Sequence, residues 1–133
     1  LDAQEGNHHK AREHYDQAVA IARGISVRDV LIEALLGRGR WAAKYIAQTS
    51  EVSKTSEVSR AFHDLDEDLG YATAGGYRRY EADIRVALAW AHLATGDTAK
   101  ARAEARRALQ LSGEMGYHWG QVDAEEVLGE LEG

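Results

Sequence analysis

Apolar and small residues recur at helical spacing along most of the chain. Within residues 98–112, Ala101, Ala105 and Ala108 follow four- and three-residue steps, and the charged residues between them fall on the opposite face. Residues 77–94 are apolar on almost every side, which is typical of a helix packed between neighbours. The pattern predicts an all-α protein of about six helices, over residues 8–23, 26–47, 57–73, 77–94, 98–112 and 117–131.

The helices belong to a repeated unit of a helix, a short turn and a second helix. The chain superposes on itself at shifts of 40, 90 and 52 residues. The matches that define these shifts are Gly76 with Gly116 and Leu69 with Leu109, then Gly6 with Gly96 and Ala11 with Ala101, and finally Leu36 with Leu88. We therefore expect a single domain, residues 1–133, built from about three copies of the unit with insertions.

Glycine marks the expected ends of the helices. At Gly96 the left-handed backbone conformation that closes a helix causes no steric clash, and the Asp97 carboxylate is placed to cap the following helix. The structural turns predicted in this way are Gly6, Gly24, Gly76, Gly96 with Asp97, and Gly116. The sequence contains no proline, so glycine takes the helix-stopping role throughout.

A duplicated hexamer interrupts the pattern. Residues 49–54 (TSEVSK) are followed by residues 55–60 (TSEVSR). Six residues advance a helix by roughly 600°, so the two copies cannot show the same face in one helix. We interpret the first copy as a linker or frayed helix end, and the second as the start of a helix that Thr55 or Ser56 caps. A lengthened surface loop is the simpler interpretation of the insertion, and a phosphorylation or docking segment is the alternative.

Composition narrows the classes of function. The 133 residues include no cysteine, which excludes disulfides, thiolate zinc sites and cysteine nucleophiles. No apolar run is long enough to span a membrane, and the net charge of -6 argues against direct binding of nucleic acid. The chain begins at Leu1 with neither an initiator methionine nor a signal-peptide pattern, so we expect a cytoplasmic fragment of a longer polypeptide.

The stretch from Ala82 to Ser112 resembles the tetratricopeptide repeat. The residues that carry the resemblance are Leu88-Ala89 in the first helix, Gly96-Asp97 at the turn, and Ala101, Ala108 and Leu109 in the second helix. Degenerate copies extend the resemblance over nearly the whole chain, although the closing proline is missing and the unit has 40 or more residues instead of about 34. Long units of this kind are similar to arrays in bacterial signal-transducing NTPases and maltose-regulator-like activators.

The resemblance implies a right-handed superhelix whose first helices line a concave groove for a peptide or a partner helix. A tryptophan and an arginine in such a groove would hold a peptide by aromatic burial and by charge-assisted hydrogen bonds. The candidate protein-binding residues are Arg38, Trp41, Tyr45, Asp83, Val86, Trp90, Leu93 and Glu126. For Trp41 and Trp90, simple packing between helices is the open alternative.

Residues 38–45 hold the most concentrated basic and aromatic group of the chain. This group, which includes Arg38, Trp41 and Tyr45, is suited to an acidic segment or a phosphate. The alternative is that it pairs with the acidic residues at positions 64–68 on a neighbouring helix, or lies in solvent.

The sequence supports no catalytic constellation. His9 and His14 are five residues apart, so they diverge on a helix instead of forming a metal-binding pair. Gly75-Gly76 lacks the lysine and the preceding strand that a phosphate-binding loop needs. We therefore predict no enzyme activity, no metal and no cofactor.

Taken together, these features predict a non-catalytic protein-interaction or sensor module of a larger bacterial regulatory protein, with a protein or peptide as its partner. A structural spacer, or a self-associating and autoinhibitory segment without an external ligand, is the alternative.

Overall fold

The structure of the protein, a computed structural model, describes residues 3–48 and 54–132. Its six helices confirm the predicted all-α fold, and this described part of the chain contains no strand. The helices are α1 (Ala3–Arg23), α2 (Arg28–Gln48), α3 (Lys54–Gly75), α4 (Arg78–Ala94), α5 (Thr98–Met115) and α6 (His118–Glu132). None of these described helices combines the length and the apolar character that a membrane crossing requires.

Three helix ends differ from the prediction by three residues or more. α1 begins at Ala3 and contains Gly6, so the turn predicted at Gly6 is wrong; a glycine inside a helix costs only about 1 kcal/mol relative to alanine. α3 begins at Lys54, so Thr55 and Ser56 lie inside the helix and neither caps it. α5 continues past residue 112 to Met115. Most of the first hexamer copy, residues 49–53, lies outside the described residues.

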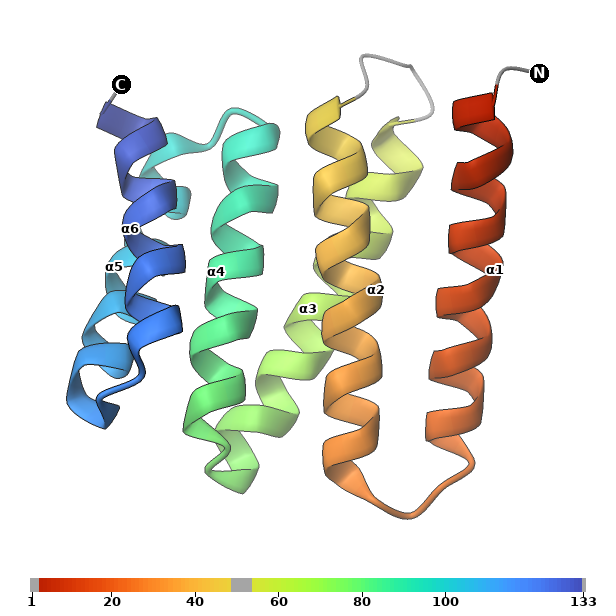
Figure 1. The fold of residues 1–133 in the computed structure, drawn as a ribbon, viewed down its shortest axis with the longest axis horizontal. Helices are drawn as coiled ribbons and strands as arrows, with labels where there is room; N and C mark the ends of the chain where they lie inside the picture. The colour runs from red at the N-terminus through yellow and green to blue at the C-terminus, as the bar shows by residue number, and fades with distance from the viewer. Residues whose placement is uncertain (1–2, 49–53, 133) are drawn as a thin grey trace.

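The helices form a row of two layers. α2, α4 and α6 stand side by side in one layer, and α3 and α5 lie behind them (Figure 1). α1 closes one end of the row by packing on α2, and the α5–α6 pair closes the other end (Figure 1). Each helix pair therefore contacts only its neighbours, which is the arrangement of a repeat array.

The last three turns of the chain share one geometry. Their glycines, Gly76, Gly96 and Gly116, have φ values of 72°, 86° and 69°. In each turn the residue after the glycine donates its backbone N–H to a carbonyl five residues earlier, as Tyr77 does to Ala72 at 2.9 Å. This pair of features defines the helix-closing motif that glycine favours, and it confirms the predicted turns at these three glycines.

The other two turn predictions have different outcomes. The Asp97 carboxylate accepts the backbone N–H of Lys100 at 3.1 Å, which confirms that Asp97 caps α5. Gly24 does follow the end of α1, but its φ is not positive and the chain runs on through residues 24–27 before α2 begins. The first turn is therefore built differently from the last three.

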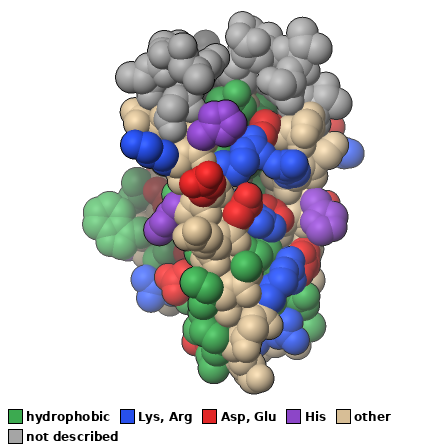
Figure 2. Space-filling view, turned by 90° about the vertical axis from the view of Figure 1, so that its right-hand side faces the viewer, with side chains coloured by type: hydrophobic (Ala, Val, Ile, Leu, Met, Phe, Trp, Pro, Cys, Tyr) green, Lys and Arg blue, Asp and Glu red, His purple; other side chains and the backbone are tan. Residues whose placement is uncertain are grey.

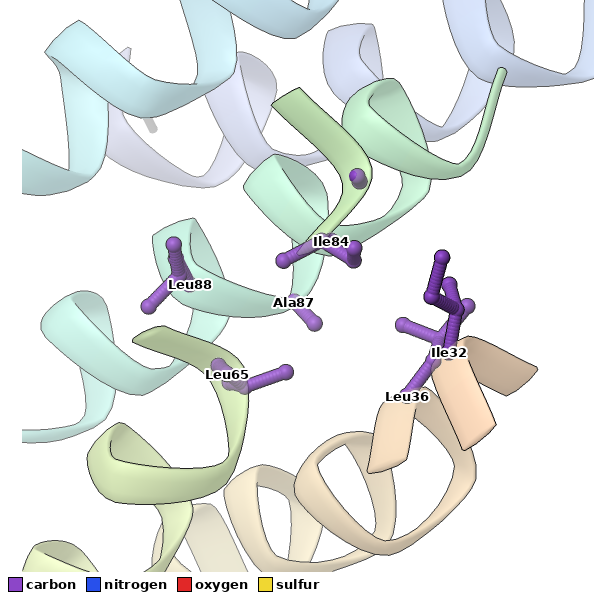
Figure 3. Close-up of a cluster of buried hydrophobic side chains, with 7 residues drawn as sticks. Ile32, Leu36, Leu65, Ile84, Ala87 and Leu88 are labelled. Carbon is purple, nitrogen blue, oxygen red and sulfur yellow. The ribbon is translucent and has the colours of Figure 1, made fainter. Parts of the chain in front are cut away.

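Two buried clusters hold the row together. The first joins α2, α3 and α4, and the second joins α4, α5 and α6. The first cluster comprises Ile32, Leu36, Leu65, Ala72, Ile84, Ala87 and Leu88, most of which Figure 3 shows. The second comprises Val86, Ala89, Ala105, Ala108, Ala124 and Val127. Because each fully buried aliphatic side chain contributes about 1.5–3 kcal/mol, these clusters fix how neighbouring units stack.

The structure corrects the register of the repeat. α2, α4 and α6 begin at residues 28, 78 and 118, so the successive shifts are 50 and 40 residues. The contacts agree with these two shifts. A Cβ at Gly39 would lie 2.6 Å from the Leu65 side chain, so the two residues are in close contact. Their counterparts Ala89 and Ala105 also pack together, in the second core cluster. The shift of 52 predicted from Leu36 and Leu88 is therefore wrong by two residues, and two residues turn a helix by about 200°.

Candidate functional site

Two of the hollows in the surface of the row bear on the predicted binding residues. The first, which we call the side cleft, has a volume of about 580 Å³ and lies between α1, α2 and α3. The second, the central groove, has a volume of about 710 Å³ and runs across the layer of α2, α4 and α6. Both are open to solvent, and both contain charged side chains, but the charges in them are arranged differently.

The three helices contribute different side chains to the central groove. α2 contributes two cations, α4 contributes an apolar floor with one carboxylate, and the chain around α6 contributes a tyrosine and two carboxylates. The lining residues are Arg40, Ala43, Lys44, Asp83, Val86, Ala87, Trp90, Tyr117, Asp123 and Glu126. The groove is thus basic on one side and acidic on the other, with an apolar strip between them.

The charges on the two sides of the central groove are not neutralised by one another. Among residues 7–46 and 56–132, neither Arg40 nor Lys44 forms an ion pair, and neither do Asp123 and Glu126. Three of the four side chains are exposed, and Asp123 is half-buried. A ligand that brings the complementary charges would therefore meet groups without other partners.

Asp83 is the most constrained polar group of the central groove. The Tyr117 hydroxyl donates a hydrogen bond to its Oδ1 at 2.9 Å, and the Arg79 guanidinium lies 4.7 Å from the centre of the Tyr117 ring. Burial raises the pKa of Asp83, although the hydrogen bond from Tyr117 and the charge of Arg40 act in the opposite direction. Burial also raises the pKa of Tyr117. This hydrogen bond joins the acidic side of the groove to its floor.

The structure brings together four of the eight predicted binding residues. Asp83, Val86, Trp90 and Glu126 all line the central groove. Val86 is buried, and the half-buried Trp90 packs against the second core cluster, so both also have a structural role. Leu93 is half-buried and does not belong to the lining of the groove.

The other three predicted residues, Arg38, Trp41 and Tyr45, do not face the central groove, and their placement there is corrected. Arg38 and Trp41 line the side cleft, whereas Arg40, Ala43 and Lys44 provide the α2 side of the groove. The two-residue error in the repeat register is the cause, because a turn of about 200° moves a residue to the opposite face of the helix. At the correct shift of 50, Arg40 is the counterpart of Trp90.

Arg38 is fully paired in the side cleft. Its guanidinium donates to both carboxylate oxygens of Asp64, at 2.7 and 2.8 Å, and to Asp16 at 3.1 Å. The hydrogen bonds to Asp64 raise the pKa of Arg38. This contact confirms, for Arg38, the predicted pairing with the acidic residues 64–68. It links α1, α2 and α3 through one side chain.

Trp41 of the side cleft belongs to a group of aromatic side chains from α1 and α2. The His8 ring lies 4.7 Å from Trp41 and 3.8 Å from Tyr45, measured between ring centres, and both pairs are stacked. Tyr15 lies 5.5 Å from Trp41. Burial, and then the nearby His9, lower the pKa of His8. For Trp41 this geometry supports the alternative of packing between helices.

Two further ion pairs tie α1 to α3. Arg12 pairs with the buried carboxylate of Glu57. Nearer the other end of α1, Arg23 donates to both oxygens of Glu67 at 2.8 and 3.0 Å, and the Tyr71 hydroxyl donates to Glu67 at 2.9 Å. Figure 2 shows the end of the row formed by α1, where acidic and basic side chains alternate. In this region the charges balance one another.

Asp68 is the exception among the acidic residues of α3. Its side chain is fully buried, and neither carboxylate oxygen has a hydrogen-bond partner in the described part of the chain. Burial, strengthened by the negative charges of Glu67 and Asp64, raises the pKa of Asp68 to about 8. A carboxylate in a helical pattern is ordinarily assigned to the solvated face. The repeat alignment does indicate that Asp68 is buried, because Asp68 occupies the position of Ala18 and of the buried Ala108.

The described residues contain no group of three or more side chains suited to a metal ion. Compared with known protein families, curated proteins and solved structures, the chain gives no match. The central groove is therefore the feature of this chain that bears most directly on function.

Proposed function

We propose that this chain is a non-catalytic protein-interaction module, a tetratricopeptide-like array that binds a peptide segment in its central groove. The observation that carries the proposal is the presence of unpaired charges of both signs on opposite sides of an apolar strip. A surface of this kind orients a peptide as well as holding it, because only one direction of the peptide matches both sides.

The lining of the groove defines the chemistry of its ligand. Arg40 and Lys44 select acidic side chains or a carboxylate, and Asp123 and Glu126 select basic ones. Between them, Trp90 offers a partly exposed ring for an apolar side chain. We therefore propose a peptide with an acidic segment, a central apolar residue and a basic segment.

A selection experiment tests this proposal. A displayed library of random peptides is selected on the immobilised chain, and the recovered peptides are measured by isothermal titration calorimetry. Selected sequences should carry opposite charges on the two sides of an apolar residue. Replacing both groove cations, Arg40→Glu with Lys44→Glu, should weaken binding of these peptides at least about tenfold, and a new selection should favour basic residues at the formerly acidic positions.

A matched control variant separates the groove from general charge effects. Arg106 and Arg107 are exposed on α5, away from the groove lining, so Arg106→Glu with Arg107→Glu changes the net charge equally. This control should leave peptide affinity unchanged. Equal loss in both variants, or selected peptides without a charge pattern, would falsify the proposal.

The second candidate function is self-association without an external ligand. One observation favours it, namely the exposure of large apolar side chains at both ends of the row.

A further inference from the structure

The exposed large hydrophobic side chains lie at the two ends of the row. Among the described residues these are Ile21, Ile25, Val27 and Val30 at the end formed by α1 and α2, and Trp119 and Val122 on α6. Figure 1 shows that α1 and α6 are at opposite ends, and that the α1–α2 turn and the start of α6 lie at the same edge of the row. Trp119 and Ile21 are 64% and 65% exposed, so both ends offer apolar surface.

A shallow groove lies between α1 and α2 at the first of these ends. We call it the end groove; it has a volume of about 410 Å³ and a mostly apolar lining. Its lining residues are His14, Tyr15, Ala18, Ile21, Ala22, Val30, Glu33, Ala34 and Gly37. On the face shown in Figure 2, hydrophobic side chains gather toward the lower part.

The repeat register shows what shape fits the end groove. At a shift of 50 residues, four of its lining positions coincide with members of the first core cluster: Tyr15 with Leu65, Ala22 with Ala72, Ala34 with Ile84, and Gly37 with Ala87. In that cluster these residues of α3 and α4 are covered by Ile32 and Leu36 of α2. The end groove is therefore the uncovered counterpart of a site that a helix like α2 fills.

α6 presents the matching stripe at the opposite end. At a shift of 90 residues Val122 takes the position of Ile32 and Trp119 takes that of Asp29, while the exposed Glu126 stands in place of Leu36. Trp119 and Val122 lie three residues apart on the same helix face, and nothing in the described chain covers them. Asp29 of α2 lies near Tyr80 of α4. Trp119 takes the position of Asp29, and Val30 takes that of Tyr80. In this register Trp119 would therefore pack on Val30.

The charges of the two ends differ. α6 carries five carboxylates and neither lysine nor arginine. α1 and α2 together carry seven lysine and arginine residues against five acidic ones. Arg12, Arg23 and Arg38 among these cations are paired within the array, so the α1 end is close to neutral. Two acidic α6 helices repel one another, which disfavours contact between like ends.

We infer that the chain binds a second copy of itself head to tail, with α6 of one copy in the end groove of the next. The contact is heterologous, because different surfaces of the two copies meet, and it therefore leaves a free end groove and a free α6 for further copies. The stack continues the layer of α2, α4 and α6 from one molecule into the next.

Sedimentation velocity over protein concentrations of about 10 µM to 1 mM tests the inference, since a small interface associates in this range. The average mass should rise above that of the 14.6 kDa monomer as concentration increases. Two variants each remove one end: Ile21→Glu with Val30→Glu blocks the end groove, and Trp119→Ala with Val122→Glu blocks α6. All four positions are exposed, so the fold should tolerate the changes. The circular dichroism spectrum of each variant should match that of the unchanged chain.

Mixing the two variants gives the decisive measurement. Each variant alone should remain monomeric, but the first keeps an intact α6 and the second an intact end groove, so the mixture should form a one-to-one dimer that grows no further. Ala20→Glu and Ala103→Glu, at exposed positions outside both surfaces, should associate like the unchanged chain. A chain that stays monomeric at about 1 mM overturns the inference, as does a mixture that remains monomeric.

Discussion

The side cleft and the central groove use charge in opposite ways. In the side cleft, Arg38 is held by Asp64 and Asp16, and the neighbouring cations of α1 pair with Glu57 and Glu67. In the central groove, Arg40 and Lys44 face Asp123 and Glu126 across an apolar strip without pairing. The two cations Arg38 and Arg40 are two residues apart in sequence, yet one stabilises the array and the other is available to a ligand.

The difference shows why proximity of charged residues in sequence is a poor guide to a binding site. A partly buried guanidinium with two carboxylate partners has no capacity left for a ligand, and removing a partner leaves an uncompensated charge. An exposed cation costs little to keep unpaired, and it contributes binding energy when a partner arrives. Pairing and burial therefore distinguish the two regions better than the type of residue does.

The largest expected effect concerns Asp68, a buried carboxylate that is neither paired nor solvated. Its pKa is raised to about 8 in the folded protein from an ordinary value of 3.8, so the folded state holds a proton that the unfolded state releases. Stability should fall as pH rises from about 4 to about 8, by up to about 1.4 kcal/mol per pH unit, and Asp68→Ala should remove this contribution. Urea unfolding at a series of pH values measures it.

Asp66→Ala is the control for Asp68, since Asp66 is an exposed carboxylate on the same helix. It should keep the pH dependence of the unchanged chain. Identical pH dependence in Asp68→Ala and in the unchanged chain would show that Asp68 is solvated or paired.

The next effect is the loss of a partner in the side cleft. Asp64→Ala leaves the guanidinium of Arg38 with only its contact to the exposed Asp16, so we expect a loss of about 3 kcal/mol in the free energy of unfolding. Asp123→Ala in the central groove removes a carboxylate without a cation partner and should change stability by less than about 0.5 kcal/mol. Denaturant unfolding of both variants makes the comparison, and equal losses would remove the distinction between the two regions.

Salt should weaken the interactions of the exposed charges in the central groove more than those of the partly buried ion pairs in the side cleft. Exposed charges are screened more strongly than partly buried ones. Raising sodium chloride from about 0.05 M to about 1 M should weaken binding of a selected peptide about tenfold, while the free energy of unfolding changes by less than about 1 kcal/mol. Calorimetry and denaturant unfolding at the same salt concentrations provide both numbers. A peptide whose affinity is insensitive to salt would indicate that the groove charges do not contact it.

The smallest effect concerns the hydrogen bond within the groove. Tyr117→Phe removes the donor to Asp83, so stability should fall by about 1 kcal/mol. Because this hydrogen bond lowers the pKa of Asp83, its loss should raise that pKa further. An NMR titration of the Asp83 carboxyl carbon measures the change. An unchanged titration in Tyr117→Phe would mean that the Tyr117 hydroxyl does not stabilise the ionised form of Asp83.

The parts of the fold that the sequence predicted well are those where local signals agree. α4 and the turn at Gly96 are examples, because apolar periodicity, the left-handed glycine and the Asp97 cap all indicate the same boundaries. The first turn lacks a left-handed glycine, and α1 tolerates Gly6 in its interior. Near α1 a glycine therefore does not by itself locate a helix end.

The candidate site was predicted only in part, for a reason that lies in α2. Small and apolar residues cover most of this helix, so Leu36 matches both Val86 and Leu88 in character and periodicity alone does not separate the two registers. Packing does separate them. Gly39, which has no Cβ, lies against Leu65, and at a shift of 50 its counterpart Ala89 belongs to the same cluster as Ala105, the counterpart of Leu65. The burial of Asp64 and Asp68 was missed because carboxylates in a helical pattern are ordinarily assigned to solvent.

The matching turns at Gly76 and Gly116 affect how the array can lengthen during evolution. Residues 77–116 begin after one of these glycines and end at the other, and the two backbones share nearly the same φ. A tandem duplication of this segment would rejoin the chain in an identical turn, with the helix faces still in phase. The length of the array can therefore grow in whole steps by copying a single stretch of coding sequence, without any new junction having to be evolved.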